Sequence, residues 1–171
     1  MNGLTESASW ETGRWYVRLY DGHLSGFWQG MEPKYENVVF GVDSGAAATV
    51  VSTEVGRNYD LNTADTRRFI VANKQFMDTY GSRRFIFDEG QHKNIGIRAQ
   101  VADVSKNLMS VAMMCDCGFD VLFSNVDGNK ATHRETGFVM NFDRRGNVYD
   151  LAVDVQSRPP KSSFHRRAAW L

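Results

Sequence analysis

The sequence predicts a mainly β protein with one short helix. The prediction rests on an unbroken apolar run at residues 38–42, an alternation of apolar and polar residues at 95–101, and helical spacing of apolar residues in a single stretch, 108–115. The chain has 171 residues, of which 42% are hydrophobic. It can therefore bury a core, and its length falls within the size range of one domain.

Strands are predicted where apolar residues run together or alternate. The segment VVFGV at 38–42 is short and continuous, as in a strand buried on both faces. At 95–101 every second residue is apolar, which is typical of a strand with one buried face. Three more strands are predicted at residues 119–123, 138–142 and 149–155. Turn signals lie between them at Asp127-Gly128 and Arg145-Gly146-Asn147.

One stretch has the spacing of a helix. Leu108, Val111, Ala112 and Cys115 lie at positions i, i+3, i+4 and i+7, so one face of a helix here would be apolar. Gly118 stands where a helix of this length would end. The second half of the chain is thus expected to hold a single short helix.

The two ends of the chain differ in composition from its middle. Residues 1–36 form an aromatic-rich leader, with an alternating pattern at 15–20 that predicts a hairpin, and Pro33 marks its boundary. From Val155 onward there is no acidic residue while cations accumulate, which predicts a disordered basic tail at 156–171. The main domain is expected at 37–155.

Charge and cysteine content limit the partners and the cellular compartment that are expected for the protein. Twenty basic and twenty acidic residues cancel, so net charge does not favour a nucleic-acid or membrane partner. Contact of the basic tail with RNA is a minor alternative. Cys115 and Cys117 are the sole cysteines, and there is no secretory signal or long apolar segment. We expect a soluble protein of a reducing compartment such as the cytoplasm.

Asp43 is the residue best placed for chemistry. It directly follows the apolar run, and it is followed by Ser44, Gly45 and Ala46 and then by the run Thr49-Val50-Val51. A carboxylate at the end of a rigid strand, on a tight turn that lets another backbone approach, suits water activation. The alternative is a plain surface turn, because Asp, Ser and Gly are common turn residues.

Two segments resemble one family of enzymes. Residues 38–51, VVFGVDSGAAATVV, resemble the active-site strand and turn of retropepsins. Residues 101–123, VADVSKNLMSVAMMCDCGFDVLF, resemble the distal part of the proteases of Copia-type retrotransposons. The order of the two segments also matches, and the resemblance covers about residues 36–155.

The resemblance implies a closed β-barrel of the acid-protease fold that works as a homodimer. Each chain would supply one catalytic Asp43 to a shared site, with Ser44 bracing the paired turns and Gly45 contacting the substrate backbone. A flap hairpin is expected at 76–87, with Tyr80 and Gly81 near its tip. The implied activity is endopeptidase cleavage of a peptide or polyprotein substrate, with no cofactor, because the nucleophile is water. No membrane partner is expected.

Departures from the family pattern keep a second function open. Ala47 and Ala48 stand where retroviral members carry acidic residues that contact substrate and stabilise the dimer. The alternative is a catalytically inactive, protease-like dimerisation or binding module.

A metal site is a further candidate, formed by Cys115, Cys117 and His133. It is disfavoured, because a C-x-C pair on a helix directs its sulfurs to different faces and no fourth ligand is evident. His92 and His133 lie in polar stretches and are expected to be solvated.

Overall fold

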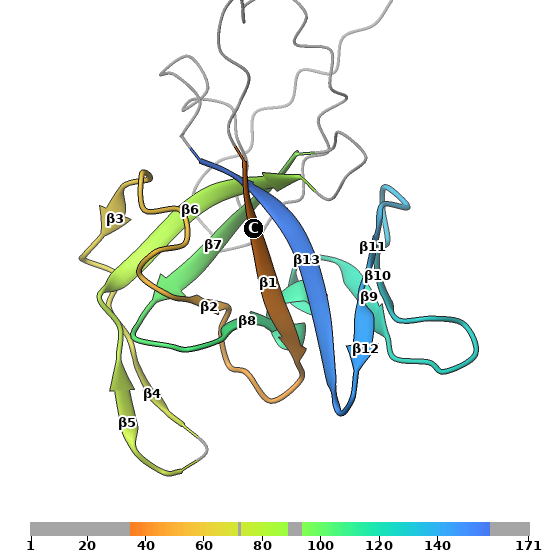
Figure 1. Cartoon of the computed structure of the whole chain (residues 1–171), viewed down its shortest axis with the longest axis horizontal. Coiled ribbons are helices and arrows are strands. Elements are labelled where there is room, and N and C mark those ends of the chain that lie inside the picture. Colours follow the sequence, from red (N-terminus) through yellow and green to blue (C-terminus); the bar gives the residue numbers. More distant parts are fainter. Residues whose placement is uncertain (1–34, 72, 89–93, 158–171) are drawn as a thin grey trace, which may run out of the picture.

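The computed structural model describes residues 35–71, 73–88 and 94–157 (Figure 1). This part of the chain is mainly β, as predicted, with one short helix. In chain order the elements are β1 Tyr35–Asp43, β2 Val50–Val51, β3 Leu61–Asn62, β4 Arg68–Ile70, β5 Phe76–Asp78, β6 Gly81–Asp88, β7 Asn94–Val101, β8 Asn107–Ser110, α1 Val111–Asp116, β9 Phe119–Leu122, β10 Lys130–His133, β11 Val139–Asn141, β12 Asp143–Arg145 and β13 Val148–Gln156.

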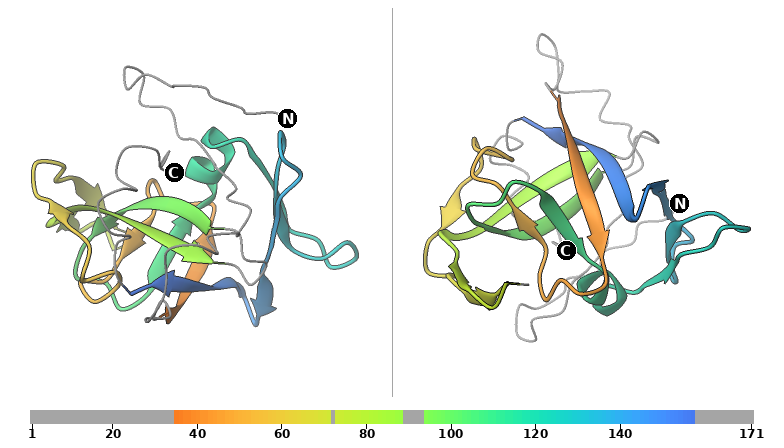
Figure 2. Two further views of the ribbon diagram at one scale, coloured as in Figure 1. Left: turned by 90° about the horizontal axis from the view of Figure 1, so that it is seen from above. Right: turned by 60° about the horizontal axis from the view of Figure 1, so that its bottom comes forward.

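The main sheet curls into a ring of strands. Its order is β12-β13-β1-β8-β2-β7-β6-β3, and an additional pairing of β13 with β6 closes the ring (Figures 1 and 2). A separate sheet, β11-β10-β9, lies to one side, and β4 and β5 form a projecting hairpin. The core fills the ring, and its largest fully buried side chains include Phe40, Phe85, Phe87, Ile95 and Leu151.

Strand β1 has one buried face. Val38, Phe40 and Val42 point into the core, whereas Val39 is 38% exposed. The prediction of a strand buried on both faces is therefore wrong. Its neighbour β13 runs antiparallel to it, and the outer face of that pair is open to solvent, as is common for antiparallel sheets.

The two ends of the described domain lie side by side. Tyr35 is paired with Gln156, and the register continues to Gly41 opposite Asp150. A strand from the end of the domain therefore supports the strand that leads to Asp43. The hairpin predicted at 15–20 lies outside the described residues, as does the basic tail beyond Ser157.

The helix begins later than its spacing predicted. Leu108 belongs to β8, and α1 starts at Val111, because the hydroxyl of Ser110 caps the first turn by accepting the N–H of Met113 at 3.3 Å. Gly118 follows the helix with φ +89°, in agreement with the predicted end.

The strands beyond the helix are close to those predicted. β9, β11 and β13 occupy the three predicted stretches, a loop containing Asp127 and Gly128 joins β9 to β10, and Gly146 turns β12 into β13. β10 was not predicted, because its sequence KATH is half polar.

Candidate active site

Asp43 is the last residue of β1 and starts a tight turn. Its side chain is half-buried, and its Oδ1 accepts the N–H of Gly45 at 2.7 Å. Ser44 and Gly45 are exposed, and Ala46 is half-buried. An Asp that accepts the N–H two residues ahead closes a local turn, so the carboxylate is held in place and stays accessible.

The two strands that flank this turn are separated by a third. β8 lies between β1 and β2, and it runs parallel to β1 so that Ser110 stands opposite Asp43. Ser110 is fully buried, and its Oγ donates to the carbonyl oxygen of Ala46 at 2.6 Å. The turn is therefore braced from the second half of the chain.

Thr49 anchors the segment that returns from the turn. Its Oγ1 accepts the N–H of Ser110 at 3.2 Å, and its carbonyl oxygen accepts the N–H of Gln100 at 2.9 Å. Its own N–H points to Sδ of Met113 at 3.2 Å. With both ends of the turn tied to β7, β8 and α1, Asp43 sits on a rigid support.

From the sequence, Thr49 was named only as the start of the run after the turn, and Ser110 was not expected to have a role at this site. A Ser just before an apolar stretch is a helix N-cap signal, so the helix start could have been placed at Ser110. Ser44 was expected to brace the paired turns. Within the described residues no hydrogen bond of Ser44 is seen. Its expected role concerns a second chain and stays a prediction.

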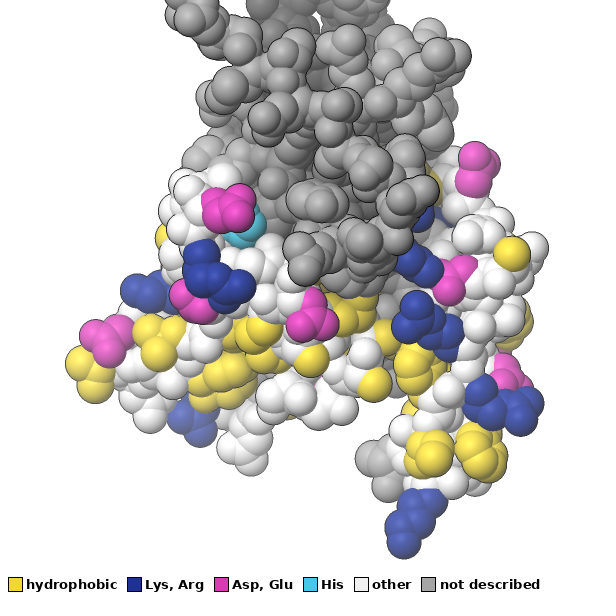
Figure 3. Space-filling view, turned by 180° about the vertical axis from the view of Figure 1, so that it is seen from behind, with side chains coloured by type: hydrophobic (Ala, Val, Ile, Leu, Met, Phe, Trp, Pro, Cys, Tyr) yellow, Lys and Arg dark blue, Asp and Glu magenta, His cyan; other side chains and the backbone are white. Residues whose placement is uncertain are grey.

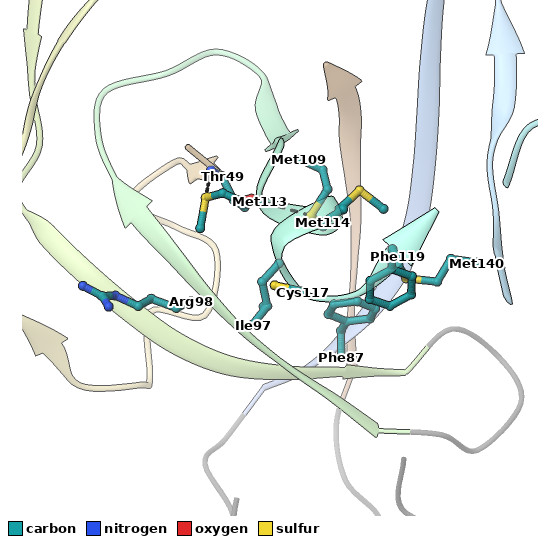
Figure 4. Close-up of a pocket in the computed structure, with 10 residues that line it drawn as sticks. All are labelled: Thr49, Phe87, Ile97, Arg98, Met109, Met113, Met114, Cys117, Phe119 and Met140. Atoms are coloured by element: carbon teal, nitrogen blue, oxygen red, sulfur yellow. Dashed lines mark hydrogen bonds between the residues drawn. The ribbon is translucent and has the colours of Figure 1, made fainter. Parts of the chain in front are cut away.

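A small cavity lies where strands β6 and β7 of the ring face α1 and the separate sheet (Figure 4). It measures ≈ 30 Å³ and is almost wholly apolar. Sulfur atoms crowd it, and Arg98 points away from the other labelled side chains. Its lining residues are Thr49, Phe87, Ile97, Arg98, Met109, Met113, Met114, Cys117, Phe119 and Met140. Asp43, Ser44, Gly45 and Ala46 do not line it, so the cavity is a packing gap of the core and lies apart from the carboxylate.

The projecting hairpin is not where the sequence placed it. β5 pairs with β4, and β6 pairs with β7, so residues 76–87 do not form a hairpin with each other. The hairpin spans β4 and β5, and Lys74, which lies between them, adopts φ +65°. It projects from the same end of the ring as the Asp43 turn (Figures 1 and 2).

Tyr80 lies between β5 and β6, and Gly81 is the first residue of β6. Gly81 has φ +140°, and a Cβ there would lie 2.3 Å from the carbonyl oxygen of Asn62. The hydroxyl of Tyr80 donates to Asp103 at 2.7 Å. The residues predicted to form the flap tip therefore lie at the base of the β4–β5 hairpin and not at its tip. The sequence could not show this, because β5 pairs with β4 and β6 pairs with β7.

Hydrophobic side chains lie open on the hairpin. Ile70 is 70% exposed and Phe76 is 67% exposed, and they stand directly opposite each other. Figure 3 shows hydrophobic side chains on this projection. On the inner side, Phe69 and Met77 pack against a small cluster of Ala48, Val50 and Ala102. Ala48, which departs from the family pattern, thus belongs to the cluster against which the hairpin packs.

The cysteines and His133 do not assemble a site. Cys115 is exposed and Cys117 is buried, and burial raises the pKa of the Cys117 thiol to about 12. His133 is also buried, with Nδ1 2.8 Å from Oγ1 of Thr136 and its ring edge-on to Phe119, so the prediction that it is solvated is wrong. No group of three potential metal ligands is found among the described residues. His92 lies outside them.

No helix in the described ranges has the length and apolar character that crossing a bilayer requires.

Comparison with known proteins found no match. No protein-family model matches the sequence, and neither the curated proteins nor the solved structures contain a significant match to it.

Proposed function

We propose that this protein is an aspartic endopeptidase of the retropepsin type that acts as a homodimer. The observation that carries the proposal is the Asp43 turn: a partly exposed carboxylate at the end of a core strand, held by the N–H of Gly45 and followed by exposed Ser44 and Gly45. The motif occurs once in the sequence, so a two-carboxylate site needs a second chain.

In the proposed reaction the two Asp43 carboxyl groups share one proton and one water. Two carboxylates so close cannot both be ionised, so one stays protonated. The ionised group takes a proton from water as its oxygen attacks the scissile carbonyl carbon, and the protonated group donates to the carbonyl oxygen. When the tetrahedral intermediate collapses, the carboxyl group that took the water proton passes it to the leaving nitrogen, the other carboxylate takes back a proton from a hydroxyl of the intermediate, and the C–N bond breaks.

The position of the hairpin supports the proposal. β4 and β5 leave the ring at the end where the Asp43 turn lies, and they carry exposed Ile70 and Phe76. In the proposed complex this hairpin, and not the Tyr80-Gly81 link, covers an extended peptide. Excluding water from the reacting groups in this way is a common role of such elements. Retroelement polyproteins are the substrate class that the sequence resemblance favours, and their processing is the proposed role.

The second candidate is an inactive dimerisation or binding module of the same fold. It is favoured by Ala47 and Ala48, of which Ala48 is only 4% exposed and engaged in packing, so neither offers a charged group to substrate.

The test incubates concentrated protein at mildly acid pH with a peptide library, with and without a pepstatin-type inhibitor, beside Asp43→Asn. The Asn variant keeps an oxygen for the Gly45 N–H but cannot act as a base, so cleavage should vanish while the fold is retained. Cleavage that persists in this variant would remove Asp43 from the mechanism. A demonstrated dimer that cleaves nothing would favour the binding module.

A further inference from the structure

Most of the buried polar residues in the described part of the chain lie between the Asp43 turn and the base of the β4–β5 hairpin. Among the described residues, seven with polar or charged side chains are buried. Five of the seven belong to this region: Thr49, Thr79, Ser82, Gln100 and Ser110. Burying polar groups is costly unless they are hydrogen-bonded, so five in one region indicate a connected network.

Gln100 contacts both ends of this region. Its backbone N–H donates to the carbonyl oxygen of Thr49 at 2.9 Å, on the segment that returns from the Asp43 turn. Its side-chain Oε1 accepts the hydroxyl of Thr79 at 2.8 Å, and its Nε2 donates to Oδ2 of Asp65 at 3.1 Å. The amide is 4% exposed and both of its ends are engaged, so its orientation is set.

Thr79 closes the base of the hairpin. Its N–H donates to the carbonyl oxygen of Arg67 at 2.9 Å, and its Oγ1 accepts the N–H of Arg67 at 2.8 Å. Arg67 precedes β4 and Thr79 follows β5. One hydroxyl therefore joins both legs of the hairpin to β7 through Gln100.

Beyond its base, the hairpin is stiff but little supported. Arg68 forms two hydrogen bonds with Asp78 across it, at 2.6 and 3.1 Å, and lies over the ring of Phe76. Within the described residues β4 and β5 pair only with each other. The contacts that hold the angle of the hairpin therefore lie at its base: the packing of Phe69 and Met77, the bonds of Tyr80 to Val101 and Asp103 on the β5 side, and the bonds of Thr79 and Gln100. Of these hydrogen bonds, those of Thr79 and Gln100 join both legs of the hairpin to β7.

A stiff arm amplifies small changes at its base. At about 3.4 Å per residue, residues 73–75 lie roughly 15 Å from Thr79, so a tilt of roughly 10° moves them by about 3 Å. Displacements of this size are large compared with the precision that catalysis needs.

We propose that Thr79 and Gln100 are positioning residues that fix the angle of the β4–β5 hairpin relative to the Asp43 turn. The structural part of this inference stands alone, and its catalytic consequence rests on the proposed function. In the proposed peptidase, the pair sets how closely Ile70 and Phe76 approach a bound peptide.

The test uses Thr79→Val, which keeps the shape of the side chain but removes the hydroxyl, beside Thr79→Ser, which keeps the hydroxyl. Gln100→Met is a second variant that removes both amide contacts. Thr132→Val, on the separate three-stranded sheet, is the matched control. Spin labels at Asn73→Cys and Ser105→Cys, in a Cys115→Ser background diluted with unlabelled protein, report the distance from hairpin to ring.

The distance distribution should broaden or shift in Thr79→Val and Gln100→Met, and should match the parent in Thr79→Ser and Thr132→Val. An unchanged distribution in both of the first two variants would overturn the inference, as would Thr79→Ser behaving like Thr79→Val.

Peptidase kinetics give the second readout. Thr79→Val should lower kcat/KM about tenfold, mostly through KM, with the pH profile of kcat unchanged, and Thr79→Ser should stay within about twofold. If the parent protein cleaves no peptide, the proposed function fails while the label distances still decide the positioning role. Altered distances with unaltered kinetics would overturn the catalytic consequence alone.

Discussion

The Oγ of Ser110 lies 2.6 Å from the carbonyl oxygen of Ala46, and this hydrogen bond joins the start of α1 to the turn that holds Asp43. The same oxygen accepts the N–H of Met113, so one hydroxyl caps the helix and braces the turn. The two residues are 64 positions apart in the sequence.

Replacing Ser110 by Ala should weaken both elements. Loss of a helix cap together with a partly buried carbonyl of Ala46 that loses its partner predicts a decrease of about 2 kcal/mol in the free energy of unfolding, measured by urea denaturation. Ser105→Ala is the control, because Ser105 is exposed. Ser110→Thr, which keeps the hydroxyl, should recover part of the loss. Equal stability of Ser110→Ala and Ser105→Ala would show that the bond contributes nothing.

Gly81→Ala should be among the most destabilising single changes. The new Cβ would lie 2.3 Å from backbone of Asn62, at a φ of +140° that other residues avoid, so a loss of about 3 kcal/mol or more is expected. Gly128→Ala is the matched control, because its φ is +77° but no heavy atom lies within 4 Å. Its cost should be about 1 kcal/mol. Thermal unfolding of the two variants compares them directly. Similar melting temperatures would contradict the close approach of Gly81 to the backbone of Asn62.

Removing β13 should abolish the fold, whereas removing the residues beyond it should not. β13 pairs with β1, β6 and β12, and Leu151, Val153 and Val155 are almost wholly buried. A chain that ends after residue 147 is expected to lose cooperative thermal unfolding, and one that ends after residue 157 to retain it. Cooperative unfolding of the shorter chain would mean that β1 does not need this partner.

The two cysteines should differ sharply in reactivity. Cys117 is buried and has a pKa of about 12, so at pH 8 almost none of it is thiolate, and raising the pH toward 12 increases the reactive fraction. Cys115 is exposed. Mass spectrometry after treatment with iodoacetamide at pH 8 should find one label per native chain, on Cys115, and two in urea. Labelling of both in the native protein would contradict the burial of Cys117.

Asp65 should stabilise the base of the hairpin in a pH-dependent way. Burial alone would raise the pKa of its carboxyl, but hydrogen bonds from Ser82 and Arg98 and the charges of Arg98 and Arg67 together lower it. A lowered folded-state pKa contributes stability above the unfolded value of 3.8, and this is lost as the pH falls through the folded value. Asp65→Asn should therefore be less stable than the parent at pH 6, with the gap narrowing below pH 3.8. A gap independent of pH would exclude this carboxylate as its source.

The sequence by itself determined the mainly β character, the strand before Asp43, the end of the helix at Gly118 and the turn near Gly146. Each follows from interactions between residues close in the chain, such as alternation of apolar side chains and the backbone freedom of Gly. Asp43 could be singled out for the same reason, because its strand and its turn are contiguous.

Only the tertiary structure decided which strands pair and therefore what surrounds Asp43. β8 lies between β1 and β2, β13 returns to support β1, and β5 pairs with β4, which moved the hairpin away from Tyr80 and Gly81. Burial of His133 and of Arg83, whose Nη1 donates to the carbonyl oxygens of Thr53 and Val55, is equally invisible in local pattern. Hydrogen bonds between segments far apart in the chain set these features, and a pattern read along the chain contains no record of which distant groups meet.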